Sequence, residues 1–136
     1  MIRVKTLTVQ LIDAQPDRIR ICRIDGESLV TVVVPREDLA EARSLPNIPQ
    51  RGVYYLLDED HGNVSRVYAG QTTQGIARLD AHKAKKEFWN KAVMFLDDDQ
   101  NISRDALDVL EAKAIDYVRT HGSYETDNSG TPKPYV

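Results

Sequence analysis

Three side chains that bind phosphate or carry protons recur at helical spacing between residues 74 and 86. Arg78, His82 and Lys85 follow one another at intervals of four and three residues, so an α-helix would carry them along one face. A guanidinium binds phosphate through two parallel charge-assisted hydrogen bonds, and an imidazole holds or passes a proton near neutral pH. This face indicates a phosphate site with a proton carrier, and a solvated polar helix face is the alternative interpretation.

A carboxylate lies within the apolar stripe of another predicted helix, which runs from residue 103 to about residue 121. On a helical wheel, Glu111 projects between Leu107 and Ile115. Burial of a carboxylate is costly unless an arginine, a lysine or a hard cation such as Mg²⁺ compensates its charge. Glu111 is therefore expected either to pair with Arg78 or a neighbouring lysine and hold the fold, or to bind a divalent ion.

Two tyrosines stand beside glycines on two neighbouring predicted strands. Tyr54 follows Gly52 by two residues, and Tyr68 precedes Gly70 by two. Strand alternation places Tyr54 on the same face as Leu56, so the phenol points toward one chosen layer. Most aromatic residues in strands serve packing, so a core role is the alternative to a catalytic phenol.

Small and polar residues follow the second of these strands. Gly70 has no side chain, which would let a phosphate approach the backbone closely. Gln71, Thr72 and Thr73 supply hydrogen-bond donors just before a predicted helix N-terminus, where anions bind well. The segment predicts a substrate-binding turn, and a plain capping turn is the alternative.

The elements that must hold these residues follow from periodicity and turn signals. Alternation and β-branched residues predict strands at residues 3–12, 18–24, 28–34, 52–57, 66–70 and 92–96. Apolar residues at helical spacing predict helices at residues 36–45, 74–86 and 103–121. Pro46, Pro49 and Gly52 mark a boundary near residue 50. We therefore expect a β-rich extension with a short helix at residues 1–50 and a second domain at residues 51–136.

The composition is that of an ordinary globular chain with an acidic balance. It has 136 residues, of which 41% are hydrophobic and 29% charged, and a net charge of −3. This charge argues against a nucleic-acid binder that relies on bulk positive charge, although basic residues gather between Arg66 and Lys91. The chain has no apolar run long enough for a bilayer and no signal-peptide pattern, so we expect a cytoplasmic protein without membrane contact. Cys22 stands alone, which excludes a disulfide framework.

Together these residues resemble the GIY-YIG nuclease family over about residues 51–130. Its two signatures are similar to Gly52-Val53-Tyr54 and Tyr68-Ala69-Gly70. The family's arginine in the first helix, histidine one turn later, glutamate in the next long helix and asparagine beyond it are matched in turn by Arg78, His82, Glu111 and Asn128. The resemblance implies an α/β (α+β) fold, in which a small three-stranded antiparallel sheet is flanked by helices. The β-rich unit at residues 1–50 resembles an extension found in some larger bacterial members, which continue past the nuclease domain.

The resemblance also implies a function, namely hydrolysis of DNA phosphodiester bonds with one Mg²⁺ or Mn²⁺ ion. Glu111 would bind the metal and Arg78 would hold the scissile phosphate. Tyr68 or Tyr54 would take the proton of the attacking water, and the sequence does not choose between them. His82 would relay a proton and Asn128 would orient the site, while the substrate would meet Gly70, Gln71, Thr72 and Lys85. Many relatives carry lysine where this chain has glutamine at position 71.

Two other classes of function compete with the nuclease. The same fold could serve as a non-catalytic nucleic-acid- or protein-docking module, which the low net charge and Gln71 favour. Binding or cleavage of RNA is a further alternative, because no residue pattern here reads the sugar. A homo-oligomer would help a weakly charged nuclease hold both DNA strands, but no residue pattern indicates one.

Overall fold

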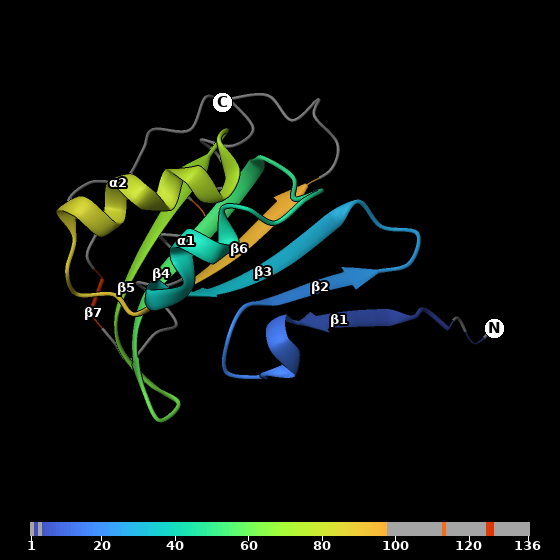
Figure 1. Cartoon of the computed structure of the whole chain (residues 1–136), viewed down its shortest axis with the longest axis horizontal. Coiled ribbons are helices and arrows are strands. Elements are labelled where there is room, and N and C mark those ends of the chain that lie inside the picture. The colour runs from blue at the N-terminus through green and yellow to red at the C-terminus, as the bar shows by residue number, and fades with distance from the viewer. Residues whose placement is uncertain (1, 3, 98–112, 114–124, 127–136) are drawn as a thin grey trace.

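The computed structural model describes residues 2, 4–97, 113 and 125–126 (Figure 1). Its strands are β1 (Leu7–Leu11), β2 (Arg20–Ile24), β3 (Leu29–Pro35), β4 (Arg51–Asp60), β5 (Asn63–Thr72), β6 (Lys91–Asp97) and β7 (Glu125–Thr126). Its helices are α1 (Leu39–Ala42) and α2 (Arg78–Lys85), with short 3₁₀ turns η1 (Ile12–Ala14), η2 (Arg36–Asp38) and η3 (Gly75–Ala77). The six strands and the first two helices expected before residue 98 are all present, with ends that differ by a few residues. The predicted helix at residues 103–121 lies outside the described residues.

The described strands form one sheet in the order β1-β2-β3-β6-β4-β5-β7. All neighbours from β1 to β5 are antiparallel, and only the two-residue β7 runs parallel to its neighbour β5. Strand β6 lies between β3 and β4, with Val33 opposite Val93 on one side and Tyr55 opposite Val93 on the other. The first three strands and the following ones therefore belong to a single sheet.

The fold class expected from the sequence is wrong. The described chain is mainly β, with six antiparallel strands and two short helices, and not a three-stranded sheet flanked by helices. The reason lies in matched alternation on β3 and β6, since Val30, Val32 and Val34 are buried opposite the buried Leu96, Met94 and Ala92. Pairing these two strands buries both apolar rows on one face, so the N-terminal strands extend the sheet. The division of the chain near residue 50 stays a prediction.

The main core lies between one face of the sheet and the two helices. Figure 1 shows α1 and α2 on the same side of the sheet. Leu39 and Ala42 of α1 and Leu79 of α2 belong to one buried cluster with side chains of β2, β3, β4 and β6. Burial of these apolar groups is the main force that holds the helices on this face.

One tight turn and one close strand contact depend on glycine. Asp25-Gly26 turns the chain from β2 to β3, as expected from the sequence, and Gly26 has a φ of 82° that suits glycine. At Gly52 the backbone of β4 approaches β6 closely. A Cβ atom at position 52 would lie 1.9 Å from the carbonyl oxygen of Phe95, so only glycine fits this position.

None of the helices found in the described part of the chain is long and apolar enough to cross a lipid bilayer.

Candidate functional site

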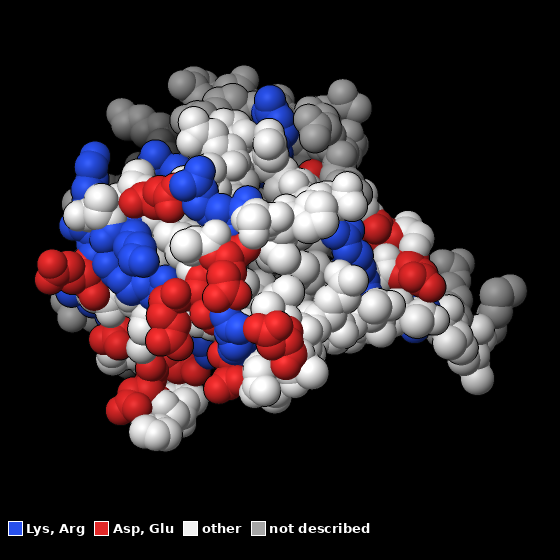
Figure 2. All heavy atoms as spheres, viewed as in Figure 1, with Lys and Arg blue, Asp and Glu red and all other residues white. Residues whose placement is uncertain are grey.

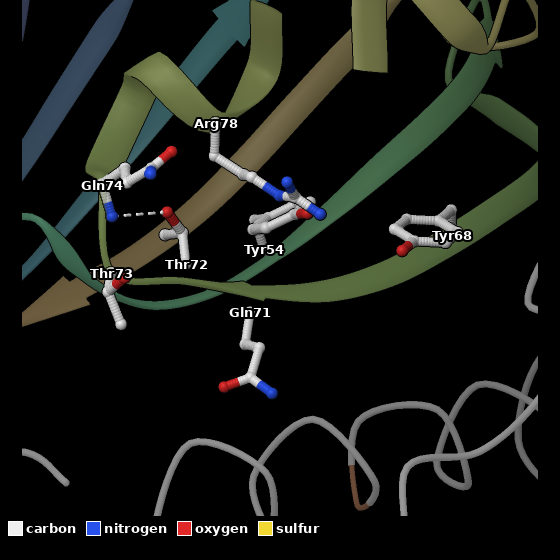
Figure 3. A pocket seen from close by; sticks show the side chains of 7 residues that line it. All are labelled: Tyr54, Tyr68, Gln71, Thr72, Thr73, Gln74 and Arg78. Atoms are coloured by element: carbon white, nitrogen blue, oxygen red, sulfur yellow. Dashed lines mark hydrogen bonds between the residues drawn. The ribbon is translucent and has the colours of Figure 1, made fainter. Parts of the chain in front are cut away.

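A polar pocket of about 310 Å³ opens where β4 and β5 meet the N-terminal end of α2 (Figure 3). It is lined by two tyrosines, one arginine and the turn that joins β5 to η3: Tyr54, Tyr68, Arg78, Gln71, Thr72, Thr73 and Gln74. Figure 3 shows the Arg78 side chain extending from the start of α2 toward the two phenols. Tyr54, Tyr68 and Arg78 were predicted as site residues although they are separated in the sequence. The structure brings all three together in this pocket.

Strand alternation aims the two phenols into this pocket. Tyr54 lies on the buried face of β4 with Leu56, and its side chain is 1% exposed, as the alternation predicts. Tyr68 lies opposite Leu56 on β5 and is half-buried. The ring centroids of the two tyrosines are 6.4 Å apart, which makes them one aromatic unit across the two strands.

The buried phenol of Tyr54 meets His82 of α2. The hydroxyl oxygen of Tyr54 and Nε2 of His82 are 2.5 Å apart and share one hydrogen bond. The ring of His82 lies 5.4 Å from the Tyr54 ring and 5.1 Å from the Tyr68 ring, so the imidazole is enclosed by both tyrosines. The bond satisfies two polar groups that would be costly to bury alone.

Gly70 makes room for this pair rather than for a ligand. A Cβ atom at position 70 would lie 2.5 Å from the hydroxyl oxygen of Tyr54 and 2.6 Å from the ring carbon that bears it. The space above Gly70 is therefore filled by the phenol. A phosphate was expected to approach the backbone at Gly70. In the structure the phenol of Tyr54 lies in that space.

His82 lies inside the protein and not on a solvated helix face. Its exposed fraction is 5%, whereas Arg78 and Lys85 are both exposed. Burial, together with the positive charges of Arg78, Lys86 and Lys85, lowers the pKa of His82 to about 4. The imidazole is consequently neutral at physiological pH, and it can either accept or donate the hydrogen bond to Tyr54.

The low pKa of His82 predicts how stability depends on pH. Below pH 6.5 the unfolded chain takes up a proton at this position that the folded protein does not take up until about pH 4. The His82 contribution to the free energy of unfolding is thus complete above pH 6.5 and is lost as the pH falls toward 4. It amounts to about 3 kcal/mol. Urea unfolding of the wild type and of His82→Gln from pH 4 to pH 7 should show that the variant lacks this slope.

The exposed His61, in the turn between β4 and β5, provides the control for that experiment. His61→Gln removes an exposed imidazole, so any change of slope that it shares with His82→Gln does not come from burial. Equal slopes for His82→Gln and the wild type would contradict the burial of a neutral imidazole at position 82.

A cation lies beside the second tyrosine. Nζ of Lys86 is 4.6 Å from the centroid of the Tyr68 ring. Lys86 was not selected from the sequence, although it follows His82 by four residues and so shares its helix face. Arg78, which lines the same pocket as Tyr68, adds a second positive charge near this phenol.

Hydrogen bonds from Arg36, which lies outside the pocket, hold the C-terminal end of α2 in place. Arg36 of η2 donates hydrogen bonds to the carbonyl oxygens of Lys86 (2.7 Å), Lys83 (2.7 Å) and Trp89 (3.2 Å), and its guanidinium lies 4.7 Å from the Trp89 ring centroid. These carbonyls at a helix end have no partner within the helix, so a guanidinium satisfies them well. The buried Trp89 in turn donates to the carbonyl oxygen of His82 (3.4 Å). No local pattern in the sequence links Arg36 to residues about 50 positions away.

The turn after β5 is built by a threonine. Oγ1 of Thr72 accepts a hydrogen bond from the backbone N–H of Gln74 (2.9 Å) and donates one to the carbonyl oxygen of Gly75 (3.4 Å). Thr72 is buried, so its role in the structure is to shape the turn. Figure 3 shows Gln71 directed to the side of the strand opposite Arg78, at the margin of the pocket.

Three of the predicted site residues that the structure describes, Gly70, His82 and Lys85, are not in the pocket lining, and two more lie outside the described residues. Lys85 is exposed and is absent from the pocket lining. Glu111 and Asn128 lie outside the described residues, and so does any contact that they make. The metal prediction therefore depends on a residue that the structure does not describe.

The described residues alone do not form a metal site. Among them, no three or more His, Cys, Asp or Glu side chains form a group that could hold a metal ion. The pocket lining offers hydroxyl, amide and guanidinium groups and no carboxylate, whereas Mg²⁺ requires oxygen ligands that include one or two carboxylates. A metal ion in this pocket would need a carboxylate from outside the described lining, and Glu111 is the one predicted from the sequence.

Comparison of the chain with protein-family models, with curated proteins and with solved structures finds no match. The similarity to GIY-YIG nucleases thus stays a prediction from the sequence, and the pocket is interpreted from its own geometry and charges.

Proposed function

We propose that this protein is an endonuclease that hydrolyses phosphodiester bonds of DNA with the help of a divalent metal ion. The observation that carries the proposal is the convergence of Arg78, Tyr68 and the Tyr54–His82 pair at one polar pocket. A guanidinium to hold a phosphate and a phenol to move a proton are two groups that this hydrolysis needs. The resemblance of the sequence to GIY-YIG nucleases supports the same residues in the same roles.

Arg78 holds the scissile phosphate in this proposal. Its guanidinium is exposed at the pocket and offers a planar set of donors that matches two phosphate oxygens. Thr73 and Gln74, which also line the pocket, provide further donors at its margin. As the phosphorus gains a fifth oxygen, its additional negative charge develops beside Arg78, which stabilises the transition state more than the ground state.

Tyr68 takes the proton of the attacking water in this proposal. It is half-buried and lines the pocket, whereas Tyr54 is 1% exposed. Lys86 contacts the Tyr68 ring and Arg78 lines the same pocket, so both cations would stabilise the negative charge that develops on the Tyr68 oxygen. The exposure and the charges thus favour Tyr68 over Tyr54 as the base.

His82 positions Tyr54 and does not act as the final proton acceptor. An imidazole whose pKa is lowered to about 4 is a weaker base than an ordinary histidine, so it is a poor acceptor for the proton of a phenol. The hydrogen bond between them instead fixes the Tyr54 ring against Tyr68 and Gly70. His82 and Tyr54 are therefore assigned as positioning residues.

The distribution of charge on the surface supports an anionic substrate at α2. Figure 2 shows Lys and Arg side chains over α2 at the upper left and acidic side chains toward the turn of the β4–β5 hairpin at the lower left. Lys83 and Lys85 are exposed on α2, close to Arg78 in the sequence of that helix. A local basic surface attracts a polyanion even where the net charge of the chain is −3.

A divalent ion bound to Glu111 would supply charge stabilisation for the leaving oxygen of the DNA. The described residues by themselves do not form a cation site.

The proposal is tested by incubating the purified full chain with Mn²⁺ or Mg²⁺ and supercoiled plasmid, branched DNA, single-stranded DNA or RNA. We expect cleavage of at least one of the DNA substrates, seen as nicked or linear product on a gel, and its loss on addition of EDTA. Cleavage of RNA alone would overturn the choice of DNA. The absence of any cleavage would overturn the proposal that the protein is a nuclease and would favour the alternative of a non-catalytic docking module.

Substitution of the predicted metal ligand tests the metal dependence. Glu111→Ala should lose cleavage at least about 10³-fold, because its carboxylate is the predicted protein ligand for the ion. The exposed Glu87, just after α2, provides a matched control, and Glu87→Ala should cleave as the wild type does. Plasmid nicking by Glu111→Ala at the wild-type rate would contradict the metal assignment. Circular dichroism of both variants checks that they remain folded.

A further inference from the structure

Strand β1 forms an exposed edge of the sheet. It pairs with β2, and in the part of the chain that the structure describes no strand lies along its other side. All five of its residues are exposed, including three large apolar ones: Leu7 (60%), Val9 (46%) and Leu11 (39%). An edge strand with exposed apolar side chains is a ready template for another strand.

The hydrogen bonds to β2 show which backbone groups of β1 point outward. Asp25 donates to the carbonyl oxygen of Thr6 (2.9 Å), and Ile12 donates to that of Ile19 (3.2 Å), which places both ends of β1 in the same register. In an antiparallel ladder, alternate residues bond to the same neighbour. The even-numbered residues from 6 to 12 therefore bond toward β2. The N–H and C=O groups of Leu7, Val9 and Leu11 are directed to the open edge.

The same three residues carry the apolar side chains of the strand. Gln10 lies opposite Ile21, which is buried on the helix-bearing face, so the odd-numbered residues of β1 project from the other face. Their cross-strand neighbours there include Ile24, opposite Leu7, and Cys22, opposite Val9. Unpaired backbone groups and exposed apolar side chains thus coincide at the same positions.

The edge lacks the usual features that prevent strand pairing. The sequence from Thr6 to Ile12 contains no charged residue, no proline and no glycine, whereas natural edges are commonly protected by lysine, proline or a bulge. Figure 2 shows mostly uncharged surface where β1 lies, at the lower right. Charged residues stand only at the two ends, with Lys5 before the strand and Asp13 after it.

We propose that two copies of the chain associate by antiparallel pairing of their β1 strands, with Val9 of one copy opposite Val9 of the other. In this register Leu7 lies opposite Leu11 and Thr8 opposite Gln10. The three outward-facing residues exchange roughly six backbone hydrogen bonds across the pair. One apolar row then forms from the side chains of Leu7, Val9 and Leu11 of both copies. Its formation buries apolar surface that is exposed in the single chain.

The symmetry of the edge favours a second copy over another partner. Leu7 and Leu11 stand at equal distances on either side of Val9, so in this register each apolar side chain of one copy meets an apolar side chain of the other. The charged residues that flank the strand, Lys5 and Asp13, already form ion pairs within the chain, with Glu27 and Arg18, so their charges are compensated at both ends. A five-residue edge is smaller than a standard interface, so we expect a dissociation constant on the order of micromolar. This proposal does not rest on the nuclease function.

Sedimentation velocity of the full chain from about 1 to 300 µM tests the dimer. The wild type should shift from monomer to dimer with increasing concentration. Val9→Lys should remain monomeric throughout, because it places two ammonium groups opposite each other. The exposed Ser28, in the turn before β3, provides the control, and Ser28→Lys should dimerise as the wild type does. A wild type that stays monomeric, or a Val9→Lys variant that dimerises equally, would overturn the proposal.

Disulfide trapping tests the register. Thr8 and Gln10 of opposite copies would form a pair without hydrogen bonds, with Cα atoms about 4.5 Å apart, which lies within the range of a disulfide. In a Cys22→Ala background, Thr8→Cys mixed with Gln10→Cys should form a covalent dimer on mild oxidation. Each variant alone should form much less. Equal yields for all three samples would overturn this pairing.

Discussion

Arg78→Ala is expected to reduce kcat for DNA cleavage about 10²–10³-fold, the loss typical when one donor to a developing negative charge is removed. The guanidinium of Arg78 is the cationic group of the described pocket lining, beside Tyr54 and Tyr68. It stabilises the additional charge of the transition state in the proposed function. Arg78→Lys should recover part of the rate, because an ammonium supplies charge without two parallel donors. Single-turnover cleavage of a labelled duplex measures both variants.

Arg43 provides the matched control for this experiment. It is also an exposed arginine close to α2, where it forms an ion pair with Asp80 at 2.6 Å. It does not line the pocket of Tyr54 and Tyr68 as described. Arg43→Ala should therefore keep the wild-type kcat and lose little stability, since exposed ion pairs contribute about 0–1 kcal/mol. Equal rates for Arg78→Ala and Arg43→Ala would remove the phosphate clamp from the proposed function.

Gly52→Ala should destabilise the fold by at least about 3 kcal/mol. The added methyl group would lie 1.9 Å from the carbonyl oxygen of Phe95 and 2.9 Å from Cα of Leu96. Both atoms belong to the backbone of β6, so no side-chain movement relieves the contact and β4 must separate from β6. Urea unfolding followed by circular dichroism gives the change in the free energy of unfolding.

Two comparisons distinguish this backbone contact from an ordinary core effect. Phe95→Ala should not rescue Gly52→Ala, because the atom in contact is the backbone oxygen and not the ring. Val53→Ala, at the half-buried neighbouring position, should cost less than Gly52→Ala although it removes atoms from the protein. A Gly52→Ala variant with wild-type stability would mean that β4 and β6 are farther apart than described.

Local patterns in the sequence predict the elements well. Alternation in residues 52–57 places Tyr54 and Leu56 on the buried face, and both are at most 1% exposed. Residue types and their spacing also predict three further features, which are the Asp25-Gly26 turn, the strand at 92–96 and the helix that begins near residue 75. These features depend on neighbours within a few residues, which a single sequence contains.

Pairing between distant strands could not be predicted in the same way. Alternation tells which residues of β3 and β6 share a face, but it does not tell that Val33 lies opposite Val93. The resemblance to a family with a three-stranded sheet led to a fold class that the six antiparallel strands contradict. Sheet order depends on the total burial of all strands, which is a property of the whole chain.

The candidate site also contains residues that local patterns predict and residues whose environment depends on distant parts of the chain. Arg78, Tyr54 and Tyr68 were selected for their residue types and spacing, and they line one pocket. The helical wheel grouped His82 with the polar residues, although it is 5% exposed. The wheel could not reveal this, because the partner that makes the burial tolerable is the hydroxyl of Tyr54, 28 residues away. The role of Arg36 could not be predicted from the sequence either, because its hydrogen-bond partners are about 50 residues away.

The central place of β6 in the sheet has a consequence for synthesis. Strands β1–β3 and the β4–β5 hairpin leave the ribosome first, and each group has an unsatisfied edge, at β3 and at β4, until Lys91–Asp97 follows. The last of these six strands to be made is the one that joins the other five. The nascent chain thus exposes the edge of β3 while about 60 further residues are made, and the edge of β4 during the later part of that period, when chaperones would protect it best.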